Sequence, residues 1–184
     1  MARLLIGLCG KKGSGKTYIA NHMHQEYDAN ICRFADTLKS MMKVMGLSDR
    51  EINGDLKEVP CKILSGKTPR YAQQTLGTEW GRDLIDENIW VNIGINKALQ
   101  YDGIAIFDDV RFPNEIKAIH ENGGVVAWVE RDSIYNGEDQ HASEVSVSPA
   151  DCDIFLDNTV DTNLVCMNLE GWATLQTYIR RKKS

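Results

Sequence analysis

Short runs of apolar residues alternate along the chain with segments in which apolar positions recur every three or four residues. Uninterrupted apolar runs are typical of parallel strands buried on both faces, and the longer spacing is typical of amphipathic helices. The pattern predicts strands at 4–9, 31–34, 104–107, 125–129 and 154–156, and helices at 17–27, 36–45, from Pro69 onward, at 88–100, 114–121 and 162–180. Because strands and helices alternate, we predict an α/β fold of three layers, a parallel sheet with helices on both faces.

Two polar segments interrupt this alternation. Residues 47–68 contain two glycines and a proline and predict an irregular surface insertion. Asp36 is expected to cap the helix that precedes this insertion. Residues 131–149 have no clear period, which is typical of a mobile lid. The length of 184 residues fits one domain, with an insertion at about 36–90 and a lid at about 131–150.

Composition and charge exclude several classes of protein. The net charge of −5 argues against a long nucleic-acid track held by phosphate contacts. The five cysteines include no CxxC pair, so reduced thiols are expected rather than a disulfide framework or a zinc site. No apolar run is long enough to span a membrane, and we expect the protein in the cytoplasm.

The motif that carries chemistry lies directly after the first expected strand. Residues 10–17 match GxxxxGK[ST] at every required position. Glycines let successive backbone N–H groups turn toward phosphate oxygens, and the positive end of the following helix lies under the same phosphates. Lys16 would reach the terminal phosphates, and the Thr17 hydroxyl would ligate Mg²⁺. The expected nucleotide-binding residues are Gly10, Lys12, Gly13, Ser14, Gly15, Lys16 and Thr17.

A P-loop by itself does not separate kinases from GTPases or motor ATPases. A GTPase should carry an NKxD-like motif, but Asn96-Lys97 continues into Ala98-Leu99. Motor ATPases usually need longer chains. The size and the missing motif therefore favour a kinase that acts on a small molecule.

Three further residues are expected to act in the transfer. Asp109 follows the strand at 104–107, at the sheet edge where ligands bind in parallel α/β folds. It would orient Mg²⁺ through water or hold the acceptor, and Arg111 would grip a phosphate bidentately. Arg131 begins the expected lid and would cover the transferring group. His141 and Glu144 lie in the same lid and either act there or only order the loop.

Lys39 and Arg70 are candidates for holding the phosphate of the acceptor. Lys39 lies on the expected helix at 36–45, and Arg70 lies at the start of the helix that begins at Pro69. Exposed basic residues without any function are common, so both readings remain open at this point.

Several segments together resemble the bacteriophage deoxynucleoside monophosphate kinase family. They occur in the family's order and cover most of the chain. Beside the P-loop they are Phe34-Ala35-Asp36 with Lys39, residues 70–90 with Leu76-Gly77-Thr78-Glu79, Asp109-Val110-Arg111-Phe112-Pro113-Asn114-Glu115, His141-Ala142-Ser143-Glu144 and Asp157-Asn158. The DVRFPNE and LGTE elements are more diagnostic than the P-loop, which many families share.

The resemblance implies a nucleoside-monophosphate-kinase-like P-loop NTPase fold with a lid. It also implies transfer of the γ-phosphoryl group of ATP to a dNMP with Mg²⁺, giving dNDP and ADP. The implied catalytic residues are Lys16, Asp109, Arg111 and Arg131. The implied acceptor-site residues are Lys39, Arg70, Gln74, Asp109, Arg111 and Glu115, with Gln74 at the base, and Asn158 would lie near the adenine of ATP.

Two other functions stay open from the residues alone. One is a P-loop kinase of another phosphorylated metabolite, of the dephospho-CoA or phosphomevalonate type. The other is a non-catalytic nucleotide-binding switch. For the kinase we expect ATP and a dNMP as the partners, no membrane and no nucleic acid, and either a monomer or a homodimer.

Overall fold

The computed structural model describes residues 4–131, 146–159, 165–166, 168–172 and 174. The chain divides into two compact units, unit 1 with Met1–Arg33 and Ile95–Ser184, and unit 2 with Phe34–Gly94. The single-domain description with an insertion at about 36–90 stays a prediction. Across the described part of the chain, no helix is both long and apolar enough to cross a bilayer.

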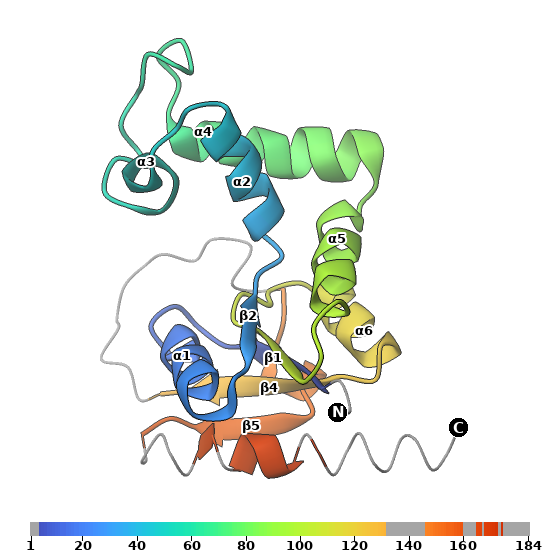
Figure 1. Ribbon diagram of the computed structural model, residues 1–184. Helices are drawn as coiled ribbons and strands as arrows, with labels where there is room; N and C mark the ends of the chain where they lie inside the picture. The colour runs from blue at the N-terminus through green and yellow to red at the C-terminus, as the bar shows by residue number, and fades with distance from the viewer. Residues whose placement is uncertain (1–3, 132–145, 160–164, 167, 173, 175–184) are drawn as a thin grey trace. The chain divides into compact units, whose positions relative to one another are not determined.

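Unit 1 is built on a five-stranded sheet in the order β2-β3-β1-β4-β5 (Figure 1). Its strands are β1 (Leu4–Cys9), β2 (Asn30–Cys32), β3 (Ile104–Phe107), β4 (Val125–Glu130) and β5 (Ile154–Asp157). All four pairings are parallel, and β1 lies between β3 and β4. The predicted parallel sheet is confirmed, and β2 ends two residues earlier than expected.

Helices cover both faces of this sheet. The helices of unit 1 are α1 (Lys16–Tyr27) and α6 (Pro113–Glu121), with the single-turn η3 (Pro149–Asp151). Side chains alternate along β1, so Leu4, Ile6 and Leu8 join the buried cluster that contains Ile19 of α1. Gly7 faces the other way, where an added Cβ would lie 2.7 Å from Ile119 of α6. Because both faces are covered, β1 is buried at all six positions, which explains its uninterrupted apolar run.

The C-terminal part of the chain completes the same apolar cluster. The described residues 165–166, 168–172 and 174 are helical, and Val165, Cys166 and Leu169 are buried in the cluster. Gly171 is among these helical residues. The remainder of the helix predicted at 162–180 lies outside the described residues.

Unit 2 is helical and has its own apolar centre. Its helices are α2 (Asp36–Val44), α3 (Asp49–Asn53), α4 (Pro69–Thr75) and η1 (Leu76–Ile85), and α5 (Ile89–Ala98) begins in this unit. The buried residues of the centre are Leu38, Met42, Leu47, Ile52 and Trp90. Asp36 is the first residue of α2 and caps nothing with its side chain, so the predicted cap was wrong.

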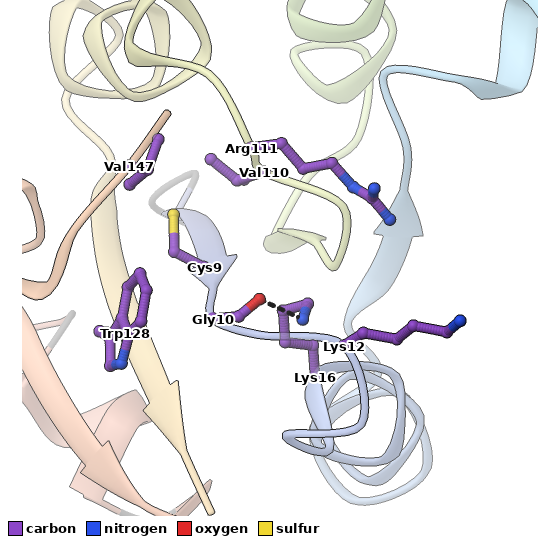
Figure 2. A pocket seen from close by; sticks show the side chains of 8 residues that line it. All are labelled: Cys9, Gly10, Lys12, Lys16, Val110, Arg111, Trp128 and Val147. Atoms are coloured by element: carbon purple, nitrogen blue, oxygen red, sulfur yellow. Dashed lines mark hydrogen bonds between the residues drawn. The ribbon is translucent and has the colours of Figure 1, made fainter. Parts of the chain in front are cut away.

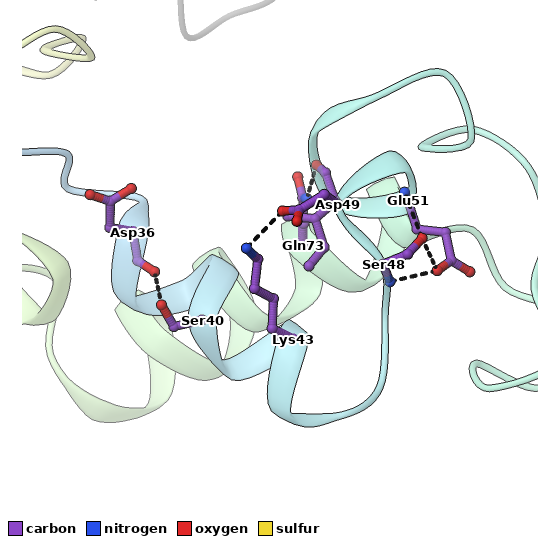
Figure 3. Close-up of polar contacts among 8 residues, drawn as sticks. Asp36, Ser40, Lys43, Ser48, Asp49, Glu51 and Gln73 are labelled. Carbon is purple, nitrogen blue, oxygen red and sulfur yellow. Dashed lines mark hydrogen bonds and ion pairs between the residues drawn. The ribbon is translucent and has the colours of Figure 1, made fainter.

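The helix α3 lies within the segment that we expected to be irregular throughout. Ser48 and Glu51 form a capping box at its start, in which the Ser48 N–H donates to Glu51 Oε2 at 2.7 Å (Figure 3). The Glu51 N–H donates in return to Ser48 Oγ at 3.4 Å. Ser-x-x-Glu before an apolar residue is a readable start signal for a helix, so the expectation overlooked it.

The LGTE element lies in a π-helix. α4 continues into η1, where Gly77 and Gly81 face Trp90 and Leu38. The Trp90 indole N–H donates to the Gly77 carbonyl at 2.8 Å, and a Cβ on Gly81 would lie 2.6 Å from the Trp90 ring. Gly81 therefore lets the Trp90 ring pack directly against the backbone of η1, and Gly77 lies against Leu38.

Candidate functional site

The P-loop runs from the end of β1 into the start of α1. Gly10 and Gly15 have φ angles of 135° and 98°, which favour glycine. Space imposes the same choice, because a Cβ on Gly10 would overlap the Val129 carbonyl oxygen and a Cβ on Gly15 would overlap the Asn158 side-chain amide. The loop is thus held closely against the ends of β4 and β5.

The first turn of α1 has the features of an anion-binding site. Gly15 is the N-cap and has no side chain to accept from the first N–H groups, and the first turn contains no acidic residue. By contrast, Thr68 caps α4 by accepting from the Tyr71 N–H at 3.1 Å. The first N–H groups of a helix have no partner within the helix, and the positive helix end favours phosphate there.

Lys16 lies across the same loop. Its Nζ donates to the Gly10 carbonyl at 2.6 Å and to the Lys11 carbonyl at 2.8 Å, and lies 3.5 Å from Ser14 Oγ (Figure 2). Thr17 follows it on the first turn of α1 and is exposed. The structure therefore brings a cation and a hydroxyl to the anion-binding end of the helix.

One pocket joins the P-loop to the segment that follows β3 (Figure 2). It is lined by Cys9, Gly10, Lys12, Lys16, Val110, Arg111, Trp128 and Val147. Arg111 is exposed, so its guanidinium is accessible to a ligand. Lys12, Lys16 and Arg111 line this pocket together, and apolar side chains form the opposite wall.

The two aspartates after β3 differ in their surroundings. β3 pairs with β1, so both follow the strand next to the P-loop. Asp109, which we predicted as the functional carboxylate, is partly buried. Asp108 is 5% exposed and pairs with Arg33, whose Nη2 donates to Oδ2 at 2.9 Å. Arg33 Nε lies 2.7 Å from Asp108 Oδ1, which is an ion-pair distance. The angle of this contact is not that of a hydrogen bond, so Oδ1 has no hydrogen-bond partner among the described residues.

Sequence reasoning missed the pair of Arg33 and Asp108. Each residue directly follows a strand, Cys32 of β2 or Phe107 of β3, and these strand ends are paired in the sheet. A charged residue directly after a strand is a signal for a functional or structural site, and both residues carry it. The amino-acid sequence does not show, however, that β2 pairs with β3. The ion pair fixes two strand ends beside the P-loop strand.

Glu115 is held at the start of α6. It is 3% exposed, and its Oε2 accepts from the Arg111 N–H at 2.6 Å and from the Phe112 N–H at 3.0 Å. The DVRFPNE element thus contains a helix start, with Pro113 at the first helical position. The carboxylate fixes the main chain that presents Arg111, while contact with an acceptor stays a prediction.

Asn158 lies directly after β5 and is 8% exposed. Its Nδ2 donates to the Ser14 carbonyl at 2.9 Å, and its backbone N–H donates to the Glu130 carbonyl at 2.8 Å. The structure therefore places the side chain of Asn158 against the main chain of the P-loop. The adenine contact stays a prediction.

The other predicted acceptor residues lie in unit 2. Lys39 is partly buried on α2, and Gln74 is exposed on α4. Arg70 is exposed at the start of α4, with its Nε 2.7 Å from Glu58 Oε1. All three residues belong to unit 2, whereas the P-loop belongs to unit 1.

Arg131 is exposed directly after β4. His141 and Glu144, with the rest of the lid at 132–145, lie outside the described residues. The part of the lid that the structure describes therefore begins at Ser146, next to Val147 of the pocket.

The chemistry of the pocket excludes a cysteine nucleophile. A hydrogen bond with Cys152, together with burial, raises the pKa of the Cys9 thiol far above its ordinary value. A thiol in that state carries almost no thiolate. Within the described residues, no group of three His, Cys, Asp or Glu side chains is placed to hold a metal ion.

Comparisons with known proteins agree with this geometry. The sequence model of the family described as Deoxynucleotide monophosphate kinase matches residues 55–166. A provisionally named deoxynucleotide monophosphate kinase of Acanthamoeba polyphaga mimivirus is 36% identical over 162 residues, which cover 78% of this chain and 82% of the viral protein. The deoxynucleoside-5'-monophosphate kinase of Escherichia phage T5 is 41% identical over 56 residues, 29% of this chain and 22% of the phage protein. The chain thus matches about a fifth of the phage protein's length.

Solved structures share the fold at low identity. The shikimate kinase of Aquifex aeolicus vf5 superposes with a TM-score of 0.52 at 10% identity, over 92% of this chain and 98% of that one. TT1252 of Thermus thermophilus superposes with a TM-score of 0.51 at 16% identity, over 95% of this chain and 97% of that one. The three-layer α/β prediction is confirmed by this likeness and by the parallel sheet.

Proposed function

Because the chain belongs to the deoxynucleotide monophosphate kinase family, we propose that it transfers the γ-phosphoryl group of ATP to a deoxynucleoside monophosphate. The observation that carries the proposal is the uncapped start of α1, with Lys16 folded over it and Arg111 in the same pocket. A triphosphate needs this combination of backbone N–H groups and cations. The reaction products are a deoxynucleoside diphosphate and ADP.

The residues present fit a metal-bound triphosphate. Backbone N–H groups from Gly13 to Thr17 would hold its phosphate oxygens, and Lys16 would exchange its bonds to loop carbonyls for bonds to phosphate. The Thr17 hydroxyl would hold Mg²⁺, with Asp109 acting through water. Bound Mg²⁺ supplies charge neutralisation between the terminal phosphates.

Three cationic side chains would stabilise the transfer. Lys16, Arg111 and Arg131 would balance the negative charge on the oxygens of the phosphoryl group while it moves in line between donor and acceptor. Asp109 would align the acceptor. A monophosphate oxygen is already a nucleophile, so the site needs no strong general base.

Unit 2 would supply the binding residues for the acceptor. Lys39 and Arg70 would bind its phosphate and Gln74 its base, as the family resemblance implies. Arg70 supports this assignment because its guanidinium is exposed and, within the described residues, forms an ion pair with Glu58 at 2.7 Å. A surface ion pair of this kind is weak and exchanges readily for a phosphate.

We place the reaction in the cytoplasm, which for a phage-encoded chain is that of the host. All five cysteines are free thiols, which suits a reducing compartment.

The central experiment is an assay of ADP release with ATP and each of the dNMPs and NMPs in turn. We expect ADP only when a deoxynucleoside monophosphate is present. Lys16→Ala should lower kcat/KM by about 100-fold or more, because it removes a charge from the transferring group. Lys117→Ala is the matched control, since Lys117 is exposed on α6 and only approaches Glu121 at 3.8 Å. Acceptor-independent turnover, or full activity in Lys16→Ala, would refute the proposal.

A second pair of variants tests the acceptor site. Arg70→Ala should raise KM for the dNMP while leaving KM for ATP unchanged, because only the acceptor phosphate loses a partner. Arg50→Ala is matched to it, since Arg50 forms the same kind of exposed ion pair, 2.6 Å from Asp55, in the same unit. Equal effects of the two variants would remove Arg70 from the acceptor site.

A further inference from the structure

The side chain of Asn158 connects two segments that are far apart in the chain. It bridges from the end of β5 to the P-loop, a separation of 144 residues, through one buried hydrogen bond of 2.9 Å to the Ser14 carbonyl. Its own backbone is fixed as well, because its N–H donates to the Glu130 carbonyl at 2.8 Å. An anchored donor thus holds one particular peptide of the loop.

That peptide lies at the centre of the anion-binding turn. The Ser14 N–H donates to the Lys11 carbonyl at 3.2 Å, and Ser14 Oγ lies 3.5 Å from Lys16 Nζ. The Ser14 carbonyl shares its peptide plane with the Gly15 N–H, which points the opposite way. By fixing the carbonyl, the Asn158 amide therefore fixes the direction of the Gly15 N–H.

The same amide also fills the space beside Gly15. Ser14 is 3% exposed and Asn158 is 8% exposed, so the contact is shielded from water. A Cβ at Gly15 would overlap Asn158 Nδ2. The loop and the asparagine are therefore packed against each other over two successive residues.

We propose that Asn158 is a positioning residue of the P-loop, which holds the Ser14–Gly15 peptide with its N–H group directed at the phosphates. This inference rests on the proposed function, since it needs a polyphosphate in the loop. It differs from an adenine contact in a measurable way. A residue that positions the P-loop affects the binding of every ligand with a polyphosphate, whereas an adenine contact affects only the binding of adenine nucleotides.

The test compares three ligands in one variant. Asn158→Leu keeps the branched shape of the side chain and removes the donor without adding charge. KM for ATP and the inhibition constants of GTP and of inorganic tripolyphosphate against ATP are measured in the wild type and in the variant. We expect all three constants to rise by about tenfold, and KM for the dNMP to change less than about twofold, because a buried carbonyl loses its donor on the ATP side only.

Asn122→Leu is the matched control. Asn122 Nδ2 donates to the Ala118 carbonyl, also at 2.9 Å, but at the far end of α6. The control should leave all these constants unchanged. A rise for ATP alone, with tripolyphosphate unaffected, would overturn the proposal in favour of an adenine contact. Unchanged constants for all three ligands would also overturn it.

A measurement on the wild type covers the case in which Asn158→Leu does not fold. The side-chain amide protons of Asn158 should exchange slowly with solvent in nucleotide-free protein, since one of them is buried in the bond to Ser14. Rapid exchange at that amide would refute the proposed role of Asn158 in positioning the P-loop. Failure of the proposed function would look different, because the wild-type enzyme would then release no ADP in response to a dNMP.

Discussion

The carboxylate of Glu115 provides the strongest test of how the site is held. Its Oε2 accepts two backbone N–H groups, from Arg111 at 2.6 Å and from Phe112 at 3.0 Å. Glu115→Ala would leave both donors without this partner at a position where the glutamate is 3% exposed. The change should therefore reduce stability and also loosen the backbone that presents Arg111.

The size of the effect follows from those two bonds. A buried donor that loses its partner costs about 1–3 kcal/mol, so the loss of two such bonds in Glu115→Ala should lower the free energy of unfolding by about 2–6 kcal/mol. Glutamine also fits the third position of a capping box, and one amide oxygen accepts both N–H groups. Glu115→Gln should therefore cost only about 1 kcal/mol, the difference between charged and neutral acceptors.

Urea unfolding followed by tryptophan fluorescence measures these differences. Glu121→Ala on the same helix is the control, since its contact with Lys117 is an exposed pair worth less than about 1 kcal/mol. A loss in Glu115→Ala no larger than in Glu121→Ala would refute the reasoning. A large rise in KM for the dNMP in a stable Glu115→Gln variant would instead identify the carboxylate as an acceptor ligand.

Three further predictions concern other parts of the chain. Arg33→Met should lower the free energy of unfolding by about 3 kcal/mol in urea titrations, because it leaves the buried Asp108 carboxylate without its cation, and Asp108→Asn in the same background should restore part of the loss. Hydrogen bonds from Ser48 lower the pKa of Glu51, so the capping box stabilises α3 above the ordinary carboxylate pKa and loses that effect as the pH falls through the lowered value. Ser48→Ala should accordingly speed hydrogen exchange in α3 more strongly at pH 7 than at a pH below that lowered pKa. Burial raises the pKa of Cys166 to about 11, so iodoacetamide at pH 8 should label it in urea and not in the folded protein; equal labelling in both would contradict its burial.

The fold was largely readable because its central strands β1 and β4 are buried on both faces. β1 and β3 appear in the sequence as apolar runs with sharp ends, and the structure reproduces both ranges. The start of α4 at Pro69 was equally clear, since proline fits the first turn of a helix. The π-helix at η1 was not predicted, because its contact between Gly81 and Trp90 joins two helices that the apolar period does not connect.

The candidate site was readable only where its residues are neighbours in sequence. The P-loop is local, so its shape follows from its own glycines and from the helix behind it. The bonds from Arg33 to Asp108 and from Asn158 to Ser14 join residues 75 and 144 positions apart. Such contacts depend on the order of strands in the sheet, which periodicity does not encode.

The separation of unit 2 has a practical consequence for engineering. Its residues, Phe34–Gly94, form one continuous stretch inserted between β2 and β3, and none of them belongs to the described apolar cluster that packs α1 against the sheet. A chimaera that exchanges this stretch for that of a relative would keep the sequence of the P-loop and of the sheet unchanged. If the acceptor residues lie in unit 2, as we propose, the preference for the acceptor should follow the exchanged stretch.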